Sequence, residues 1–203
     1  MSRKIFVGVL TLVVFMPVIA IGTVALMNGF EVKELKVFGE VPSFSLTERT
    51  GQLLRKEDLQ GKVWLASFIY THCAGQCPMI SKQMKEIQRK LRFKERFRLV
   101  SISVDPERDT PSELTKYADE FEADPYKWLF LTGNKNEIIR LMRHGFRLAS
   151  ADDKGVASGE ILHSDKLVLV DHMGKIRGYY DAFDEEAVKT MMKDTKSLIR
   201  KAF

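Results

Sequence analysis

VWLASFIYTHCAGQCP, residues 63–78, is the stretch of this sequence that says most about its architecture. Its first half, 63–70, is almost continuously apolar and rich in aromatic and branched side chains, which predicts a central strand buried on both faces. Cys73 and Cys77 follow directly, and Pro78 suits the first turn of a helix. We therefore expect a buried strand, a short turn that carries the chemistry, and then a helix.

The pattern continues outward in both directions. On the N-terminal side, two alternating segments flank a turn and predict a β-hairpin, and on the C-terminal side strand and helix patterns alternate. The hairpin is expected at 41–55, further strands at 97–104, 128–131, 167–170 and 175–180, and helices at 78–91, 110–121, 134–144 and 184–202. No internal repeat or long linker divides these elements, so we predict one α/β domain with a single sheet and helices on both faces.

The first of these helices has apolar residues at near-helical spacing. They are Met79, Met84, Ile87 and Leu91. We expect these four side chains to form the face that packs on the sheet.

An apolar stretch without charged residues runs from Ile5 to Met27. Its 23 residues suffice to cross about 30 Å of hydrocarbon at about 1.5 Å per residue, so residues 1–30 are predicted to hold a single transmembrane helix. An uncleaved anchor fits better than a cleaved signal peptide, whose apolar core has only about 7–15 residues. Arg3 and Lys4 precede the stretch, so the positive-inside rule keeps the N-terminus in the cytoplasm. The domain is then expected on the periplasmic or extracytoplasmic side of the inner (cytoplasmic) membrane.

Composition excludes several classes of protein. The 203 residues include 32 Lys and Arg against 27 Asp and Glu, a formal net charge of +5, which is too mild for a dedicated nucleic-acid binder. Phosphate-loop, zinc-protease and Ser/His/Asp signatures are absent from the sequence. Setting aside residues 1–30 leaves one nearly neutral domain, residues 31–203.

Charge is nevertheless unevenly distributed along this domain. Segment 82–98 carries eight basic and two acidic residues, and segment 105–124 carries eight acidic and two basic residues. Such faces are typically solvated; the alternative is a surface that docks a partner protein or anionic lipid beside the anchor. Asp105 begins the acidic segment directly after a predicted strand, where it either lies at the rim of the site or caps the following turn.

The two cysteines of the chain form a pair. A spacing of i, i+4 places Cys73 and Cys77 on one face of a helix with backbones about 6 Å apart, which a disulfide accepts. The start of a helix favours the thiolate, the form that attacks disulfides and binds metals, and leaves it exposed enough to react. A structural disulfide and a pair of inert buried thiols are the alternatives, although so short a loop stabilises a domain only weakly.

The chain offers few ligands for a metal besides this pair. Structural zinc needs four Cys or His ligands, whereas two thiolates and one imidazole suit soft Cu(I). Four histidines could supply the imidazole: His72, His144, His163 and His172. His72 adjoins the pair and faces away from it, His144 ends a predicted helix, and His172 lies at a hairpin tip. His163 precedes a predicted strand, and such a loop can return beside the cysteine turn.

Three motifs of this sequence together resemble the Sco/SenC family. They are F-x-Y-T-x-C-x-x-x-C-P at 68–78, SVDPERDTP at 103–111, and His163 ahead of LVLVD at 167–171. The resemblance covers about residues 38–203. It implies a thioredoxin-like fold with an N-terminal β-hairpin, preceded here by the predicted membrane helix.

The resemblance also implies a function. In that family two cysteines and a distal histidine bind one copper ion, Cu(I) or Cu(II), and the protein helps to assemble the CuA centre of cytochrome c oxidase subunit II. Carried over to this chain, the ligands are Cys73, Cys77 and His163. The first hypothesis is therefore a copper metallochaperone, a binding protein rather than an enzyme, whose partner is subunit II or another copper acceptor.

Two other functions stay open. The first is a thiol-disulfide oxidoreductase in which Cys73 and Cys77 form a redox-active pair that reduces the acceptor's cysteines, and here His163 is dispensable. The second is a copper or redox sensor that acts through a partner.

Overall fold

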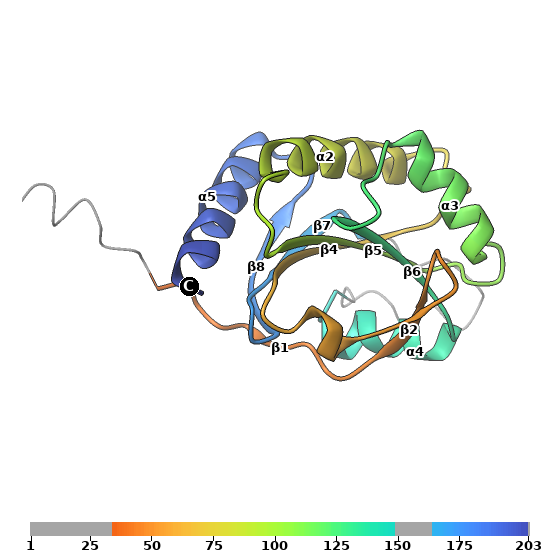
Figure 1. The fold of residues 1–203 in the computed structure, drawn as a ribbon, viewed down its shortest axis with the longest axis horizontal. Coiled ribbons are helices and arrows are strands. Elements are labelled where there is room, and N and C mark those ends of the chain that lie inside the picture. Colours follow the sequence, from red (N-terminus) through yellow and green to blue (C-terminus); the bar gives the residue numbers. More distant parts are fainter. Residues whose placement is uncertain (1–33, 149–163, 203) are drawn as a thin grey trace, which may run out of the picture. The chain divides into compact units, whose positions relative to one another are not determined.

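The computed structural model describes residues 34–148 and 164–202, and in this part of the chain eight strands form one sheet in the order β1-β8-β7-β4-β5-β6-β2-β3 (Figure 1). The strands are β1 Gly39–Glu40, β2 Ser45–Glu48, β3 Leu53–Arg55, β4 Val63–Ile69, β5 Phe97–Ser103, β6 Trp128–Thr132, β7 Lys166–Val170 and β8 Lys175–Asp181. The α-helices are α2 Gln76–Leu91, α3 Pro111–Glu120, α4 Lys135–Arg140 and α5 Glu185–Lys201, and two short turns of other helix types lie at Lys56–Leu59 and Leu141–Gly145. The predicted α/β domain and its N-terminal hairpin, β2–β3, are confirmed.

Strand pairing gives the sheet two distinct edges. Strands β4, β5 and β6 are parallel, with Val63 opposite Phe97 and Leu99 opposite Trp128. Strand β7 pairs antiparallel with β4, with Ala66 opposite Val168, so β7 begins level with the end of β4. We call the edge where β4, β5 and β6 end the thiol edge, and the edge where they begin the far edge. Because β4 has seven residues, the two edges lie about 20 Å apart at about 3.3 Å per residue.

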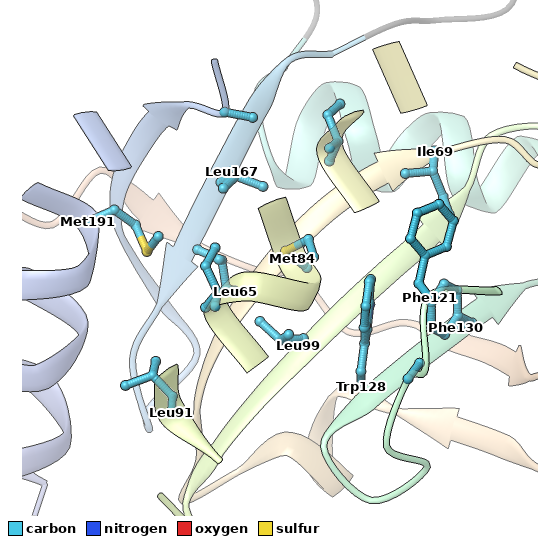
Figure 2. Packing of buried hydrophobic residues seen from close by; sticks show 14 of the residues in the cluster. Leu65, Ile69, Met84, Leu91, Leu99, Phe121, Trp128, Phe130, Leu167 and Met191 are labelled. Atoms are coloured by element: carbon cyan, nitrogen blue, oxygen red, sulfur yellow. The ribbon is translucent and has the colours of Figure 1, made fainter. Parts of the chain in front are cut away.

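Strand β4 is buried along its whole length because both faces of the sheet are covered. Figure 1 shows α2, α3 and α5 on one face and α4 on the other. On the first face Leu65 packs in a core with Met84 of α2 and Met191 of α5, as Figure 2 shows. On the second face Trp64 meets Phe146 edge to face, with ring centroids 5.9 Å apart. Alternate residues of β4 thus serve two cores, which accounts for its continuous apolar run.

Helices α3, α4 and α5 begin at side chains that accept hydrogen bonds from backbone N–H groups of the first turn, which would otherwise be unpaired. Thr110 accepts from Glu113 N–H at 3.3 Å ahead of Pro111, the first residue of α3. Asn134 accepts from two N–H groups at the start of α4, and Asp184 does the same for α5. Each of these caps stabilises its helix by about 1 kcal/mol.

Two details of the helices differ from the sequence predictions. Met79 is 55% exposed, and Ile80 takes its place in the buried stripe with Met84, Ile87 and Leu91. The stripe is set by the spacing i, i+4, i+7 and i+11 from Ile80, and Met79 lies about 100° round the helix from it. The helix predicted at 134–144 ends as an α-helix at Arg140 and continues as one wider π turn, which Phe146 N–H closes on Leu141 O at 2.8 Å.

The first described residues are tied to the β7–β8 turn by one arginine. Arg177 donates through Nη1 to Leu35 O at 2.8 Å and through Nε to Asp171 Oδ2 at 2.6 Å. Asp171 Oδ1 in turn accepts from the N–H groups of Met173 and Lys175. Within residues 34–148 and 164–202 no helix is long and apolar enough to cross a membrane. The stretch from Ile5 to Met27 lies outside the described residues, so the predicted anchor stays a prediction.

Candidate functional site

The two cysteines lie at the thiol edge, between the end of β4 and the start of α2. Cys73 is in the turn, where its N–H donates to Tyr70 O at 3.4 Å, and Cys77 is the second residue of α2. Cys77 N–H donates to Cys73 Sγ at 3.5 Å, and both thiols are free. The prediction that both lie on one helical face was therefore wrong, because Cys73 precedes the helix. The pair is brought together instead by a first-turn N–H group that would otherwise lack an acceptor.

Both thiols are more buried than the position at a helix start predicts. Cys73 is 8% exposed and Cys77 is 3% exposed, and both belong to the core between the sheet and α2. The turn folds back over the end of the sheet, so its two sulfur atoms pack inward rather than toward water. Any reaction at the pair therefore starts from a largely desolvated sulfur atom. Cys73 is the more accessible of the two cysteines.

The environment gives the two thiols different acidities. Burial, the largest single influence on Cys73, acts to raise its pKa, but hydrogen bonds outweigh it and lower the pKa to about 7. The donors are the backbone and thiol of Cys77, the Gly75 backbone and the Tyr70 hydroxyl. Burial raises the pKa of Cys77 to about 12, and the neighbouring Cys73 adds to the rise, although a hydrogen bond with the Tyr70 backbone opposes it. Cys73 is therefore the thiolate of the pair near neutral pH.

Tyr70 is a site residue to which the sequence analysis assigned no role. Its hydrogen bond to Cys73 is the main cause that raises the pKa of the Tyr70 hydroxyl to about 12. The hydroxyl therefore stays protonated and can donate to the Cys73 thiolate throughout the physiological range. A signal for this contact was present in the sequence, since Tyr70 is the last residue of the apolar run and lies three positions before Cys73.

Asp109 is a second residue that the sequence analysis missed, and its hydrogen bonds hold the cysteine turn in place. Its carboxylate is fully buried and accepts from Thr71 Oγ1 at 2.6 Å, Thr71 N–H at 3.1 Å and Ser103 Oγ at 2.5 Å. Because β4 and β5 are parallel neighbours, the segments that follow them meet at the same edge of the sheet. That rule could have placed Asp109, which follows β5, beside Thr71, which follows β4.

Asp105 has a structural role in the same loop. Its backbone carbonyl accepts from the N–H groups of Arg108 and Asp109, and its carboxylate pairs with Arg108. The second interpretation of the sequence, a turn-stabilising residue, is the one that these contacts support.

The four histidines lie in different places. His72 is beside the pair on the exposed side of the turn, with Nδ1 2.9 Å from Thr71 Oγ1 and 3.9 Å from Asp109 Oδ1. His144 is exposed on the π turn, and His172 lies in the β7–β8 turn at the far edge. His163 lies outside the described residues, and Lys166 begins β7 three positions later, level with the end of β4. Within the described part of the chain, no three His, Cys, Asp or Glu side chains come together as a metal site.

The described half of the site has two chemical capacities. A thiolate beside a thiol at a helix start is a soft donor pair, which suits Cu(I) far better than a hard cation. The same two sulfur atoms, which are hydrogen-bonded to each other, can also close to a disulfide when two electrons and two protons are removed.

Comparison with known proteins agrees with this arrangement. The family model described as SCO1/SenC matches residues 34–200. The "SCO1 protein homolog" of Bacillus subtilis (strain 168) is 32% identical over 160 residues, which are 78% of this chain and 82% of that protein.

Solved structures give the same result. The structure of BsSco, reported for a disulfide switch in "a member of the Sco family of cytochrome c oxidase assembly proteins", superposes with a TM-score of 0.71 at 30% identity, over 82% of this chain and 98% of that one. Bradyrhizobium japonicum ScoI with copper bound superposes with a TM-score of 0.60 at 26% identity, over 76% of this chain and 98% of that one. The fold is the thioredoxin-like α/β fold of these proteins, and this chain belongs to the SCO1/SenC family.

Proposed function

We propose that this chain is a membrane-anchored copper metallochaperone. It holds one copper ion through Cys73, Cys77 and His163 and passes it to an acceptor on the same face of the membrane, the CuA site of cytochrome c oxidase subunit II. Family membership supports this, since relatives at 26% and 30% identity are named for bound copper and for oxidase assembly.

The single observation that carries the proposal is the pair of free thiols at the thiol edge. Cys77 N–H donates to Cys73 Sγ at 3.5 Å and the two thiols are also hydrogen-bonded, so one ion can reach both sulfur atoms with little movement of the turn. The lowered pKa of Cys73 supplies the first thiolate near neutral pH. The raised pKa of Cys77 means that its proton leaves as the metal binds, so copper uptake releases a proton and strengthens with rising pH.

The third ligand is supported by topology. Strand β7 begins level with the end of β4, where the cysteine turn starts. A residue shortly before Lys166 is therefore attached at the thiol edge, which favours His163. His172 is attached at the far edge, about 20 Å away along β4.

The buried position of both thiols supports transfer by ligand exchange. An incoming acceptor thiolate meets the site at Cys73, the more exposed sulfur, and copper changes partners one ligand at a time without release to water. Low-coordinate Cu(I) suits such exchange because an extra soft ligand can add before one leaves.

The second candidate function is that of a thiol-disulfide oxidoreductase, and the separation of the two pKa values favours it. The Cys73 thiolate attacks an acceptor disulfide, releases one acceptor thiol and forms a mixed disulfide. Cys77 then attacks Cys73, giving the Cys73–Cys77 disulfide and the second acceptor thiol, so two electrons and two protons pass to the acceptor. The copper or redox sensor uses the same pair.

Copper titration of the reduced full-length chain in detergent tests the proposal. We expect one Cu(I) per chain with two sulfur and one nitrogen ligand by X-ray absorption. Binding should fall sharply in Cys73→Ser, Cys77→Ser and His163→Ala. His144→Ala and His172→Ala are matched controls and should bind like the wild type. Unchanged binding in His163→Ala would remove it from the ligand set, and absence of tight binding with a readily cycled disulfide would favour the oxidoreductase.

A further inference from the structure

Positive charge gathers at the far edge of the sheet, opposite the cysteine pair. Segment 90–98, which ends α2 and leads into β5, is joined there by the residues that precede β4 and β6. The cations are Lys62, Lys90, Arg92, Lys94, Arg96, Arg98 and Lys127, and the acidic neighbours are Asp58, Glu95 and Asp124. Five of the eight basic residues of segment 82–98 therefore lie at this end of the domain.

Two large aromatic side chains lie among these cations and are almost fully exposed. Phe93 is 82% exposed and Tyr126 is 81% exposed, the two highest values among the large hydrophobic side chains of the described residues. Arg92 stacks over the Phe93 ring, with its guanidinium carbon 4.5 Å from the ring centroid. Aromatic rings held among Lys and Arg are typical of surfaces that lie at the boundary between lipid headgroups and acyl chains.

The two loops that carry these rings are fastened to each other. Lys127 Nζ donates to Lys94 O at 2.8 Å, and Leu99 N–H donates to Lys127 O at 2.8 Å. Arg98 also lies close to Lys127. Phe93 and Tyr126 are therefore presented by one continuous surface rather than by two independent loops.

We propose that this surface, defined by Lys62, Lys90, Arg92, Phe93, Lys94, Arg96, Arg98, Tyr126 and Lys127 and called the far-edge patch, lies on the anionic lipid surface of the membrane. The exposed cations Lys90, Arg92 and Lys94 bind lipid phosphates, and the two rings enter the headgroup region. Each Lys or Arg near an anionic bilayer adds to the attraction, and two inserted rings add apolar burial.

The length of chain between the apolar stretch and the domain supports a membrane as the occupant. Only seven residues, 28–34, separate Met27 from Leu35, so the extended connection between these two spans at most about 29 Å. This step rests on the membrane anchor proposed above. With the anchor inserted, the bilayer is within reach of the domain at all times, whereas a soluble acidic partner has to be recruited. The cysteine pair then points away from the bilayer, about 20 Å above the patch along β4.

A tryptophan placed in the patch tests the proposal in the full-length chain. We would reconstitute Phe93→Trp into nanodiscs of brominated phosphatidylcholine with and without phosphatidylglycerol. The native Trp64 and Trp128 are 1% and 0% exposed and give a constant background. We expect strong quenching by the bromines when phosphatidylglycerol is present and clearly weaker quenching in phosphatidylcholine alone. Met79→Trp, a 55% exposed site near the thiol edge, is the matched control and should remain unquenched.

Charge variants separate lipid recognition from simple proximity. Lys90→Glu combined with Lys94→Glu should reduce the quenching of Phe93→Trp to the level of the Met79→Trp control. Lys116→Glu combined with Lys135→Glu, two lysines outside the patch, should leave it unchanged. Equal quenching at both reporters, or quenching that survives the Lys90 and Lys94 substitutions, would overturn the proposal. No quenching at Phe93→Trp would also overturn it and would favour an acidic protein as the occupant.

Alkaline carbonate extraction tests separately whether the chain is inserted in the membrane through its N-terminal anchor. A chain that resists extraction but shows no quenching at Phe93→Trp refutes the patch and leaves the anchor standing. If carbonate extracts the chain, and Phe93→Trp was quenched on the membrane before extraction, the result supports the far-edge patch and refutes the anchor.

Discussion

Replacing Tyr70 by Phe should make Cys73 a weaker acid while leaving the fold in place. The substitution removes the hydroxyl that donates to Cys73 and keeps the ring that packs against the core. A hydrogen bond to a charged group contributes about 1.5–3 kcal/mol, and 1.36 kcal/mol corresponds to one pKa unit. Because Tyr70 is only partly buried, water replaces some of the lost donation. We therefore expect the pKa of Cys73 to rise by about one unit from its value of about 7.

The assay is the pH dependence of iodoacetamide alkylation, with the modified sulfur identified by tandem mass spectrometry. Cys77 should remain largely unmodified up to high pH, since burial raises its pKa to about 12. The midpoint of the Cys73 profile is the proper readout, because a thiolate of higher pKa is also more nucleophilic and partly offsets its lower population at neutral pH. Tyr126→Phe removes an exposed hydroxyl far from the site and should leave the profile unchanged. A Tyr70→Phe profile that coincides with the wild type would refute the assigned hydrogen bond.

Two further predictions concern stability. Asp109→Ala should lower the free energy of unfolding by about 3 kcal/mol, because Thr71 and Ser103 lose a buried acceptor. Asp109→Asn should lower it by less. A urea unfolding midpoint of Asp109→Ala equal to that of the wild type would contradict this prediction. Between pH 7 and 9 the wild type should gain about 2 kcal/mol relative to Cys73→Ser, because Cys73 titrates at a lower pH folded than unfolded. Above pH 9 the reduced wild type should lose stability relative to Cys77→Ser, because Cys77 titrates at a higher pH folded than unfolded; a difference that stays flat with pH in either comparison would exclude the assignment it tests.

The sequence predicted well those strands and helices whose pattern of apolar residues follows directly from which faces are buried. The run 63–70 could only be a strand covered on both faces, and β4 serves one core through Leu65 and the other through Trp64. The buried stripe of α2 was placed correctly except at Met79, because Met79 is five residues before Met84 and Ile80, four residues before it, lies on the same face.

The sequence predicted that Cys73 and Cys77 lie together, and the hydrogen bond from Cys77 N–H to Cys73 Sγ shows that they do. It predicted neither that Cys73 precedes the helix nor that both thiols are buried. Asp109 was missed because its contact with Thr71 joins two loops that are distant in sequence and adjacent only through the parallel pairing of β4 and β5. His163 stays a prediction, since it lies outside the described residues.

The contacts of Arg177 have a mechanical consequence. If the proposed anchor and acceptor both hold the domain, it is pulled whenever the two move apart, and the pull enters the described chain near Leu35. Its first resistance is the Arg177 Nη1–Leu35 O bond, followed by the short β1–β8 pairing. A force along β1 loads the β1–β8 hydrogen bonds in shear. Strands β8 and β7 lie between β1 and β4, so loss of the β1–β8 pairing leaves β4 and the cysteine turn that follows it in place.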